Sequence, residues 1–127
     1  MTEQAIANEI RQKARELADD FGADFLVELV GDYLDEADVR MTRLRQALAA
    51  SDAATVTYEA HTLKSSSANI GAQSFADLAK RFEALSREGD LAVLAGEVEL
   101  FVRQYAAVKA SLEELRGAPD RFIARES

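Results

Sequence analysis

Apolar residues recur every three or four positions along most of this chain, which is the spacing that gathers them on one face of an α-helix. The most regular segment spans 91–115, where the apolar positions alternate three and four apart without interruption. These positions are Leu91, Leu94, Val98, Phe101, Tyr105, Val108, Leu112 and Leu115. Such a continuous stripe is typical of a helix that packs in a bundle.

A second long helix is predicted from Asp24 to just before Ser51. Its apolar positions are Leu26, Val30, Tyr33, Ala37, Met41, Leu44 and Leu48. The other face of the segment is acidic, and its members are Asp24, Glu28, Asp32, Asp35, Glu36 and Asp38. We expect this acidic face to be solvated.

Two shorter helices are predicted between these long ones. The first carries a narrow seam made of Val56, Ala60, Leu63, Ser67 and Ile70. Either Ser51 or Asp52 is a suitable N-cap, and Gly71 is suited to end this helix after Asn69 because glycine readily adopts left-handed backbone conformations. The stripe of the second helix is Phe75, Leu78, Phe82 and Leu85, and residues 88–90 end it.

The fold class predicted from these segments is all-α, an antiparallel four-helix bundle with a short additional N-terminal helix over residues 4–20. Helix breakers are scarce, since the chain has six glycines and one proline. A chain of 127 residues has the size of one domain. We expect that domain to span 1–127, with a core at about 22–116 and a C-terminal tail at 117–127. The pattern does not decide whether Phe122 and Ile123 of this tail pack.

Composition excludes several functions. The chain has no cysteine and one histidine, which rules out disulfides, thiolate metal sites and multi-histidine metal centres, and it has no compact carboxylate loop for a metal. A net charge of -8 argues against nucleic acid as a partner. No apolar run approaches the roughly 20 residues needed to span a membrane. We expect a cytoplasmic protein without a membrane segment.

The one histidine, His61, lies beside the apolar seam of its predicted helix, so we expect it to be exposed. An exposed imidazole is largely neutral at neutral pH and is therefore nucleophilic. Lys64 and Ser65 lie three and four positions further on, over the same face. A lysine there can neutralise a phosphoryl group held on the ring, although an ordinary solvated lysine is an equally simple interpretation.

The predicted hairpin around Gly71 points to a partner for His61. His61 lies ten residues before this glycine, so in an antiparallel pair the residue at similar height lies about eleven to thirteen residues after it. That count leads to Glu83, whose carboxylate could accept a hydrogen from one ring nitrogen and leave the other as nucleophile. The alternative is that Glu83 pairs with Lys80 or Arg87 on its own helix.

Residues 61–71, HTLKSSSANIG, resemble the signature of histidine-containing phosphotransfer domains. In that family a histidine is followed by one variable residue, by Leu-Lys, by small residues and, ten positions after the histidine, by a glycine. The short histidine–lysine spacing alone would mean little, but here the small residues, the glycine and the hairpin occur together. The resemblance covers about residues 52–88 directly. The family has a glycine immediately after the lysine, where this chain has Ser65.

The resemblance implies a phosphorelay intermediate rather than an enzyme. It makes His61 the phosphoacceptor, lets Lys64 steady the phosphoryl group and assigns ring orientation to Glu83. The implied partners are response-regulator or hybrid-kinase receiver domains, which would dock over Ser65, Ala68 and Arg87. The receiver would supply Mg²⁺, and the chain itself would need no cofactor and have no ATP-dependent kinase activity.

Two alternatives stay open on the sequence. A helical adaptor would bind signalling partners without phosphotransfer. A phosphoacceptor segment of a chemotaxis-type kinase would receive its phosphoryl group from a kinase domain. A single phosphoacceptor in a closed bundle needs no dimer, so we expect a monomer.

Overall fold

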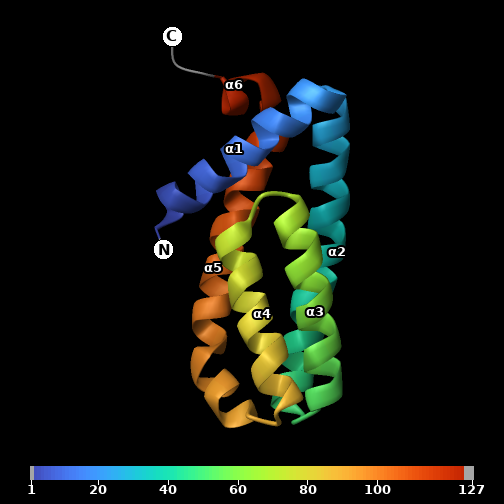
Figure 1. Cartoon of the computed structure of the whole chain (residues 1–127), viewed down its shortest axis with the longest axis vertical. Coiled ribbons are helices and arrows are strands. Elements are labelled where there is room, and N and C mark those ends of the chain that lie inside the picture. The colour runs from blue at the N-terminus through green and yellow to red at the C-terminus, as the bar shows by residue number, and fades with distance from the viewer. Residues whose placement is uncertain (1, 125–127) are drawn as a thin grey trace.

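The structure of the protein is a computed structural model that describes residues 2–124 (Figure 1). Within this range all regular structure is helical, which confirms the all-α prediction. The helices are α1 (Glu3–Phe21), α2 (Ala23–Ala49), α3 (Ala53–Asn69), α4 (Gln73–Arg87), α5 (Leu91–Gly117) and α6 (Pro119–Ile123).

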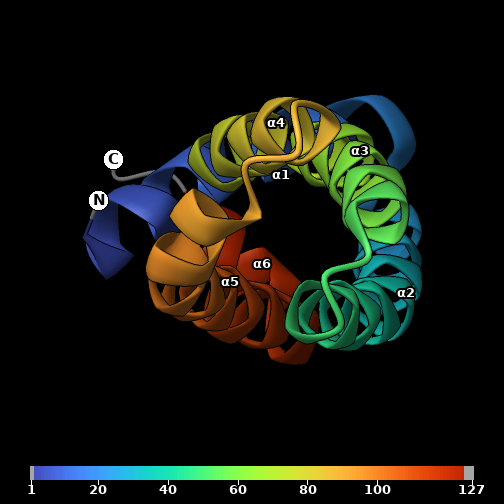
Figure 2. The ribbon, with the colours of Figure 1, turned by 90° about the horizontal axis from the view of Figure 1, so that it is seen from below.

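Helices α2 to α5 run antiparallel to their neighbours in the chain and close into a ring when viewed along the bundle (Figures 1 and 2). Short connections explain the antiparallel order, because the three residues between successive helices of the bundle leave no room for a crossover. Helix α1 lies obliquely across the end where α3 turns into α4, and α6 lies beside it (Figure 1). The predicted four-helix bundle with an additional N-terminal helix is therefore confirmed.

The predicted apolar seams face the interior. Every seam residue of α3, from Val56 to Ile70, is buried. Some seam residues of the other helices are only half-buried, namely Leu48, Leu78, Leu85, Leu91 and Val98. Phe101 of α5 stacks on Phe75 and Phe82 of α4, with ring centroids 4.7 and 4.4 Å apart. This aromatic stack fixes α4 against α5 on the side of α4 opposite to α3.

Helix α1 holds the α3–α4 turn. Its Glu9 carboxylate accepts the backbone N–H of Ser74 at 3.3 Å and also the Ser74 hydroxyl, in the first turn of α4. A carboxylate is stabilising there because the N–H groups of a first helical turn have no partners within the helix. Gly71 has φ +92°, and a Cβ atom on it would collide with the side chain of Lys13. The turn therefore needs glycine for its conformation and for the close approach of α1.

Ser67 has a specific reason to lie in an otherwise apolar seam. Its Oγ atom is 2.7 Å from the Tyr33 hydroxyl oxygen, and both residues are buried between α2 and α3. Burial raises the pKa of Tyr33 to about 12, so the phenol stays protonated at neutral pH. A buried hydroxyl needs such a partner, and this pair ties α2 to the helix that carries His61.

The acidic face of α2 includes one residue, Asp38, that has specific partners on α5 although its side chain is 46% exposed. The carboxylate of Asp38 accepts hydrogen bonds from the Tyr105 hydroxyl at 2.6 Å and from Lys109 Nζ at 2.9 Å, both on α5. Burial alone would raise the Asp38 pKa, but these two donors outweigh it and lower the pKa. The sequence pattern missed this contact because Asp38 follows the seam residue Ala37 and lies at the edge of the interface with α5.

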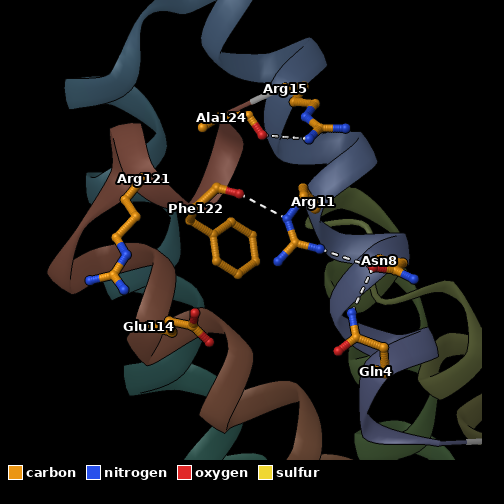
Figure 3. Close-up of a pocket in the computed structure, with 8 residues that line it drawn as sticks. All are labelled: Gln4, Asn8, Arg11, Arg15, Glu114, Arg121, Phe122 and Ala124. Carbon is orange, nitrogen blue, oxygen red and sulfur yellow. Dashed lines mark hydrogen bonds between the residues drawn. The ribbon is translucent and has the colours of Figure 1, made fainter. Parts of the chain in front are cut away.

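The C-terminal segment packs on α1 as far as it is described. Phe122 of α6 is buried, and the guanidinium of Arg11 lies 4.7 Å from its ring centroid. Arg11 Nε donates to the Phe122 carbonyl at 2.8 Å, and Arg15 donates to the Ala124 carbonyl at 2.8 Å (Figure 3). Arg15 also donates to the Ile123 carbonyl at 2.9 Å. These bonds satisfy carbonyls at the end of α6. The end of the predicted tail, 125–127, lies outside the described residues.

Candidate functional site

His61 projects from the flank of α3, beside the seam that faces the core. The neighbouring seam residues Ala60 and Leu63 are fully buried, so the backbone of His61 is held rigidly by packing. Its side chain is nevertheless 58% exposed. The protein therefore presents an accessible imidazole from a fixed position, which is the arrangement that the spacing of the seam predicts.

The α3–α4 hairpin brings Glu83 directly to the ring. The Nδ1 atom of His61 lies 2.8 Å from Oε2 of Glu83, a hydrogen-bonding distance. An ionised carboxylate only accepts hydrogen bonds, so the neutral ring carries its proton on Nδ1 in this contact. Nε2 makes no hydrogen bond within residues 2–124 and keeps its lone pair. The nucleophilic nitrogen of the arrangement is therefore Nε2.

The same carboxylate also holds two cationic side chains. Lys64 Nζ donates to Oε1 of Glu83 at 2.7 Å, and Arg87 Nη2 donates to Oε2 at 2.9 Å. The sequence left two interpretations open for Glu83, a hydrogen bond with His61 or pairing with a basic residue of its own helix. Both apply, because Glu83 binds His61 and Arg87. Lys80, the other basic residue considered, makes no described contact with Glu83. The Lys64 ammonium is therefore bound to the Glu83 carboxylate and is not free above the imidazole ring of His61.

Glu83 stays ionised although it is only 5% exposed. The hydrogen bond from Lys64 lowers its pKa most strongly, burial opposes this, and the contacts with His61 and Arg87 lower the pKa further, to about 2. A buried carboxylate with several cationic donors favours its charged form. At neutral pH the group that faces Nδ1 is therefore an anion.

A second link between α3 and α4, which the sequence analysis missed, lies one turn away from this contact. The hydroxyl oxygens of Thr57 and Ser86 are 2.7 Å apart, and Ser86 also donates to the backbone carbonyl of Glu83 at 3.1 Å. Thr57 precedes His61 by four residues and Ser86 follows Glu83 by three, so the same helical spacing could have revealed this pair. The contact between Thr57 and Ser86 fixes the position of α4 relative to α3 along the helix axes.

On the α2 side of His61, a buried ion pair was also missed. Glu59 is buried on α3, and its Oε2 atom lies 2.9 Å from Arg40 Nη1 on α2. Arg40 additionally pairs with Glu36 at 2.8 Å, and its guanidinium lies 5.7 Å from the ring centroid of Tyr58. Tyr58 is 61% exposed and precedes His61 by one turn. Arg40 thus connects α2 to the part of α3 that immediately precedes His61.

The two small residues assigned to docking lie in different surroundings. Ser65 is exposed one turn after His61, and its Oγ donates weakly to the His61 carbonyl at 3.4 Å. Ala68 is half-buried and lines a hollow of about 300 Å³ together with residues of α1, among them Lys13. The surface next to His61 is therefore open at Ser65 but bordered by α1 at Ala68.

The other cavities described here lie away from the imidazole. The cavity of about 720 Å³ between α1 and the C-terminal segment has polar walls formed by Gln4, Asn8, Arg11, Arg15, Glu114, Arg121, Phe122 and Ala124 (Figure 3). It includes neither His61 nor any side chain bound to Glu83. Within residues 2–124, no cluster of histidine and carboxylate side chains has the arrangement of a metal site. None of the helices described here is both long enough and apolar enough to cross a membrane.

Comparison with known proteins identifies the class. The sequence profile of the Hpt domain matches residues 28–118, which is most of the chain, so the protein belongs to the Hpt domain family. Among solved structures it is similar to histidine-containing phosphotransfer protein B (HptB) from Pseudomonas aeruginosa PAO1. The two share 26% sequence identity with a TM-score of 0.77, over 84% of this chain and 91% of that chain. No curated protein sequence matches significantly.

The family assignment confirms the resemblance of residues 61–71 and defines the general function. The protein is a histidine phosphotransfer domain of the phosphorelay type, a class whose members carry phosphoryl groups and interact with response-regulator receiver domains.

Proposed function

We propose that this protein accepts a phosphoryl group on Nε2 of His61 and exchanges it with the aspartate of receiver domains. The observation that carries this proposal is the contact between His61 Nδ1 and Glu83 Oε2 at 2.8 Å, because it leaves Nε2 unprotonated and turned to solvent. Exposure of the ring lets the phosphorylated aspartate of a partner reach this nitrogen.

The transfer is a substitution at phosphorus. The Nε2 lone pair attacks the phosphorus of the receiver's aspartyl phosphate, the P–O bond to aspartate breaks, and a P–N bond forms. Aspartate leaves as a carboxylate, and the imidazole, which keeps its Nδ1 proton, gains a positive charge. The Glu83 carboxylate lies against Nδ1 and stabilises this charge as it develops. The reverse reaction returns the phosphoryl group to another receiver.

Lys64 is the side chain that we assign to the phosphoryl oxygens. It lies one turn after His61 on the same helix, and its ammonium already sits near the ring, at Oε1 of Glu83. Mg²⁺ is assigned to the receiver, which would supply most of the catalysis. The protein then acts as a carrier without ATP-dependent kinase activity of its own.

The proposal is tested by incubating the protein with a phosphorylated receiver domain and with ATP alone, each compared with His61→Gln. Wild type should gain label from the receiver, the variant should gain none, and neither should gain label from ATP. The label should be lost in acid and survive base, as a phosphoramidate does. Because His61 is exposed, the variant should keep the helical circular dichroism and the unfolding midpoint of wild type.

Other outcomes would contradict the proposal. Label on both proteins would place the phosphoryl group elsewhere than His61. Label from ATP alone would overturn the carrier assignment. Absence of label from a broad panel of phosphorylated receivers, with binding to them retained in wild type and in His61→Gln, would favour the adaptor. Label from a separate kinase domain but from no receiver would favour the chemotaxis-type alternative.

A further inference from the structure

The two oxygens of the Glu83 carboxylate have different partners. Within residues 2–124, Oε1 accepts only from Lys64, at 2.7 Å, whereas Oε2 accepts from both His61 Nδ1 at 2.8 Å and Arg87 Nη2 at 2.9 Å. The carboxylate is buried, and the arginine that holds it from the solvent side is 65% exposed. One anion is therefore shared by two permanent cations and by the ring.

If Lys64 contacts the phosphoryl group, it has to leave Glu83. Its departure breaks the contact at Oε1 and leaves both contacts at Oε2 in place. A buried carboxylate that loses its only cation would be strongly destabilised and would tend to take up a proton or turn towards water. Glu83 keeps a cationic partner when Lys64 leaves, because Arg87 stays beside Oε2, the oxygen that binds His61.

The two cations are suited to different tasks. A lysine has a flexible stem and a compact charge with rotatable donors, so it can change partners with little reorganisation. Arg87 reaches Glu83 across one turn of the same helix, and the planar donor group of an arginine holds a carboxylate in a defined orientation. Its position on α4 keeps it with Glu83 whatever Lys64 on α3 does.

We propose that Arg87 is a positioning residue, which keeps Glu83 ionised and directed at His61 Nδ1 while Lys64 moves to the phosphoryl group. This inference rests on the proposed function, since Lys64 has a reason to leave only if the ring is phosphorylated. It gives Arg87 a task within the protein, in addition to the docking role that the family resemblance implies.

The tautomer of His61 reports directly on this role, and the chain has no other histidine. Long-range ¹H–¹⁵N correlation spectra distinguish a protonated ring nitrogen from an unprotonated one. The ratio of the Nδ1–H to the Nε2–H tautomer would be measured in wild type, Lys64→Ala, Arg87→Ala and the double variant. Lys64→Ala imitates the departure of the lysine without any phosphoryl donor, so the measurement does not depend on phosphotransfer.

Each single variant should keep a tautomer ratio close to that of wild type, because one cation still holds Glu83. In the double variant the ratio should fall about tenfold or more, as expected when a hydrogen bond to a charged group is lost. Adding Arg87→Lys to Lys64→Ala should retain part of the wild-type ratio. Arg81→Ala is the matched control, since Arg81 also lies on α4 but pairs with Glu97 at 3.1 Å. Circular dichroism would confirm that all variants fold.

Two results would overturn the inference. One is a wild-type ratio in the double variant. The other is a loss in Lys64→Ala as large as in the double variant, because Arg87 would then be insufficient. A full loss in Arg87→Ala alone would support the inference, because Arg87 would then direct Glu83 even while Lys64 is present. A failure of receiver-dependent labelling would instead count against the proposed function and would leave these ratios interpretable.

Discussion

The Nδ1 atom of His61 and the Oε2 atom of Glu83 lie 2.8 Å apart, although 22 residues of chain separate the two side chains. One is exposed and the other is buried, so the pair joins the surface of the bundle to its interior. Through this contact the rigid α3–α4 hairpin decides which nitrogen of the imidazole is available for reaction.

Replacement of Glu83 tests the contribution of this contact to phosphotransfer. Glu83→Ala removes the acceptor of the Nδ1 proton, and we expect the transfer rate from a phosphorylated receiver to fall about 10- to 100-fold, the range for a lost hydrogen bond to a charged group. Glu83→Gln keeps an acceptor without the charge and should retain more activity. Equal rates in wild type and Glu83→Ala would refute an orienting role for Glu83.

The stability of the fold should depend on the ionisation of Glu83. Because its pKa is lowered from an ordinary value of 4.5 to about 2 in the folded state, its stabilising effect is fully present above pH 4.5. The effect should decline as the pH falls from 4.5 and be lost below about 2. Urea unfolding of wild type and Glu83→Gln between pH 7 and pH 3 should show a difference in unfolding free energy that narrows towards acid. A difference independent of pH would contradict this assignment.

The Tyr33–Ser67 hydrogen bond should contribute to stability in an asymmetric way. Ser67→Ala leaves the buried Tyr33 hydroxyl without a partner and should cost about 1–3 kcal/mol, the penalty of an unsatisfied buried polar group. Tyr33→Phe should cost about 1 kcal/mol, since the serine can turn to a backbone carbonyl of its own helix. The double variant should lose less than the sum of the two. Additive losses in urea unfolding would show that the hydroxyls do not interact.

The two glycines Gly71 and Gly89 form a matched pair for testing the α3–α4 turn. Both have positive φ angles, +92° and +80°, but only at Gly71 would a Cβ atom collide with another element, at Lys13 of α1. Gly89→Ala should destabilise by about 1–2 kcal/mol through backbone strain alone. Gly71→Ala should cost a further 1–3 kcal/mol or so, the usual effect of overpacking. Equal effects on the unfolding free energy would mean that α1 does not pack against the turn as described.

Several features of the site could be predicted from sequence because they depend on local geometry. The seam from Val56 to Ile70 fixes which face of α3 is buried, and so it places His61 on the flank. Counting through a short turn after Gly71 leads to Glu83, since two antiparallel helices rise equally per residue. These inferences need only the helical repeat and the turn.

Other features could not be predicted because they depend on how the helices pack. Asp38 looks like one more member of an acidic face, yet it binds Tyr105 and Lys109 of α5. The position of α1 over the α3–α4 turn follows from the contact between Glu9 and Ser74, which are 65 residues apart. No periodicity links such positions, because their proximity is set by the angles between helices.

The sequence by itself determined helices α1 to α5, the antiparallel order of the bundle and the identity of the exposed histidine, because helical periodicity and short connections leave few arrangements for an apolar stripe of this kind. Only the tertiary structure decided how charge is shared at the site. The seam spacing cannot tell whether Lys64 and Arg87 extend into solvent or converge on Glu83, since long side chains choose among many rotamers. That choice follows from burial of the carboxylate, which makes pairing with both cations the favourable state.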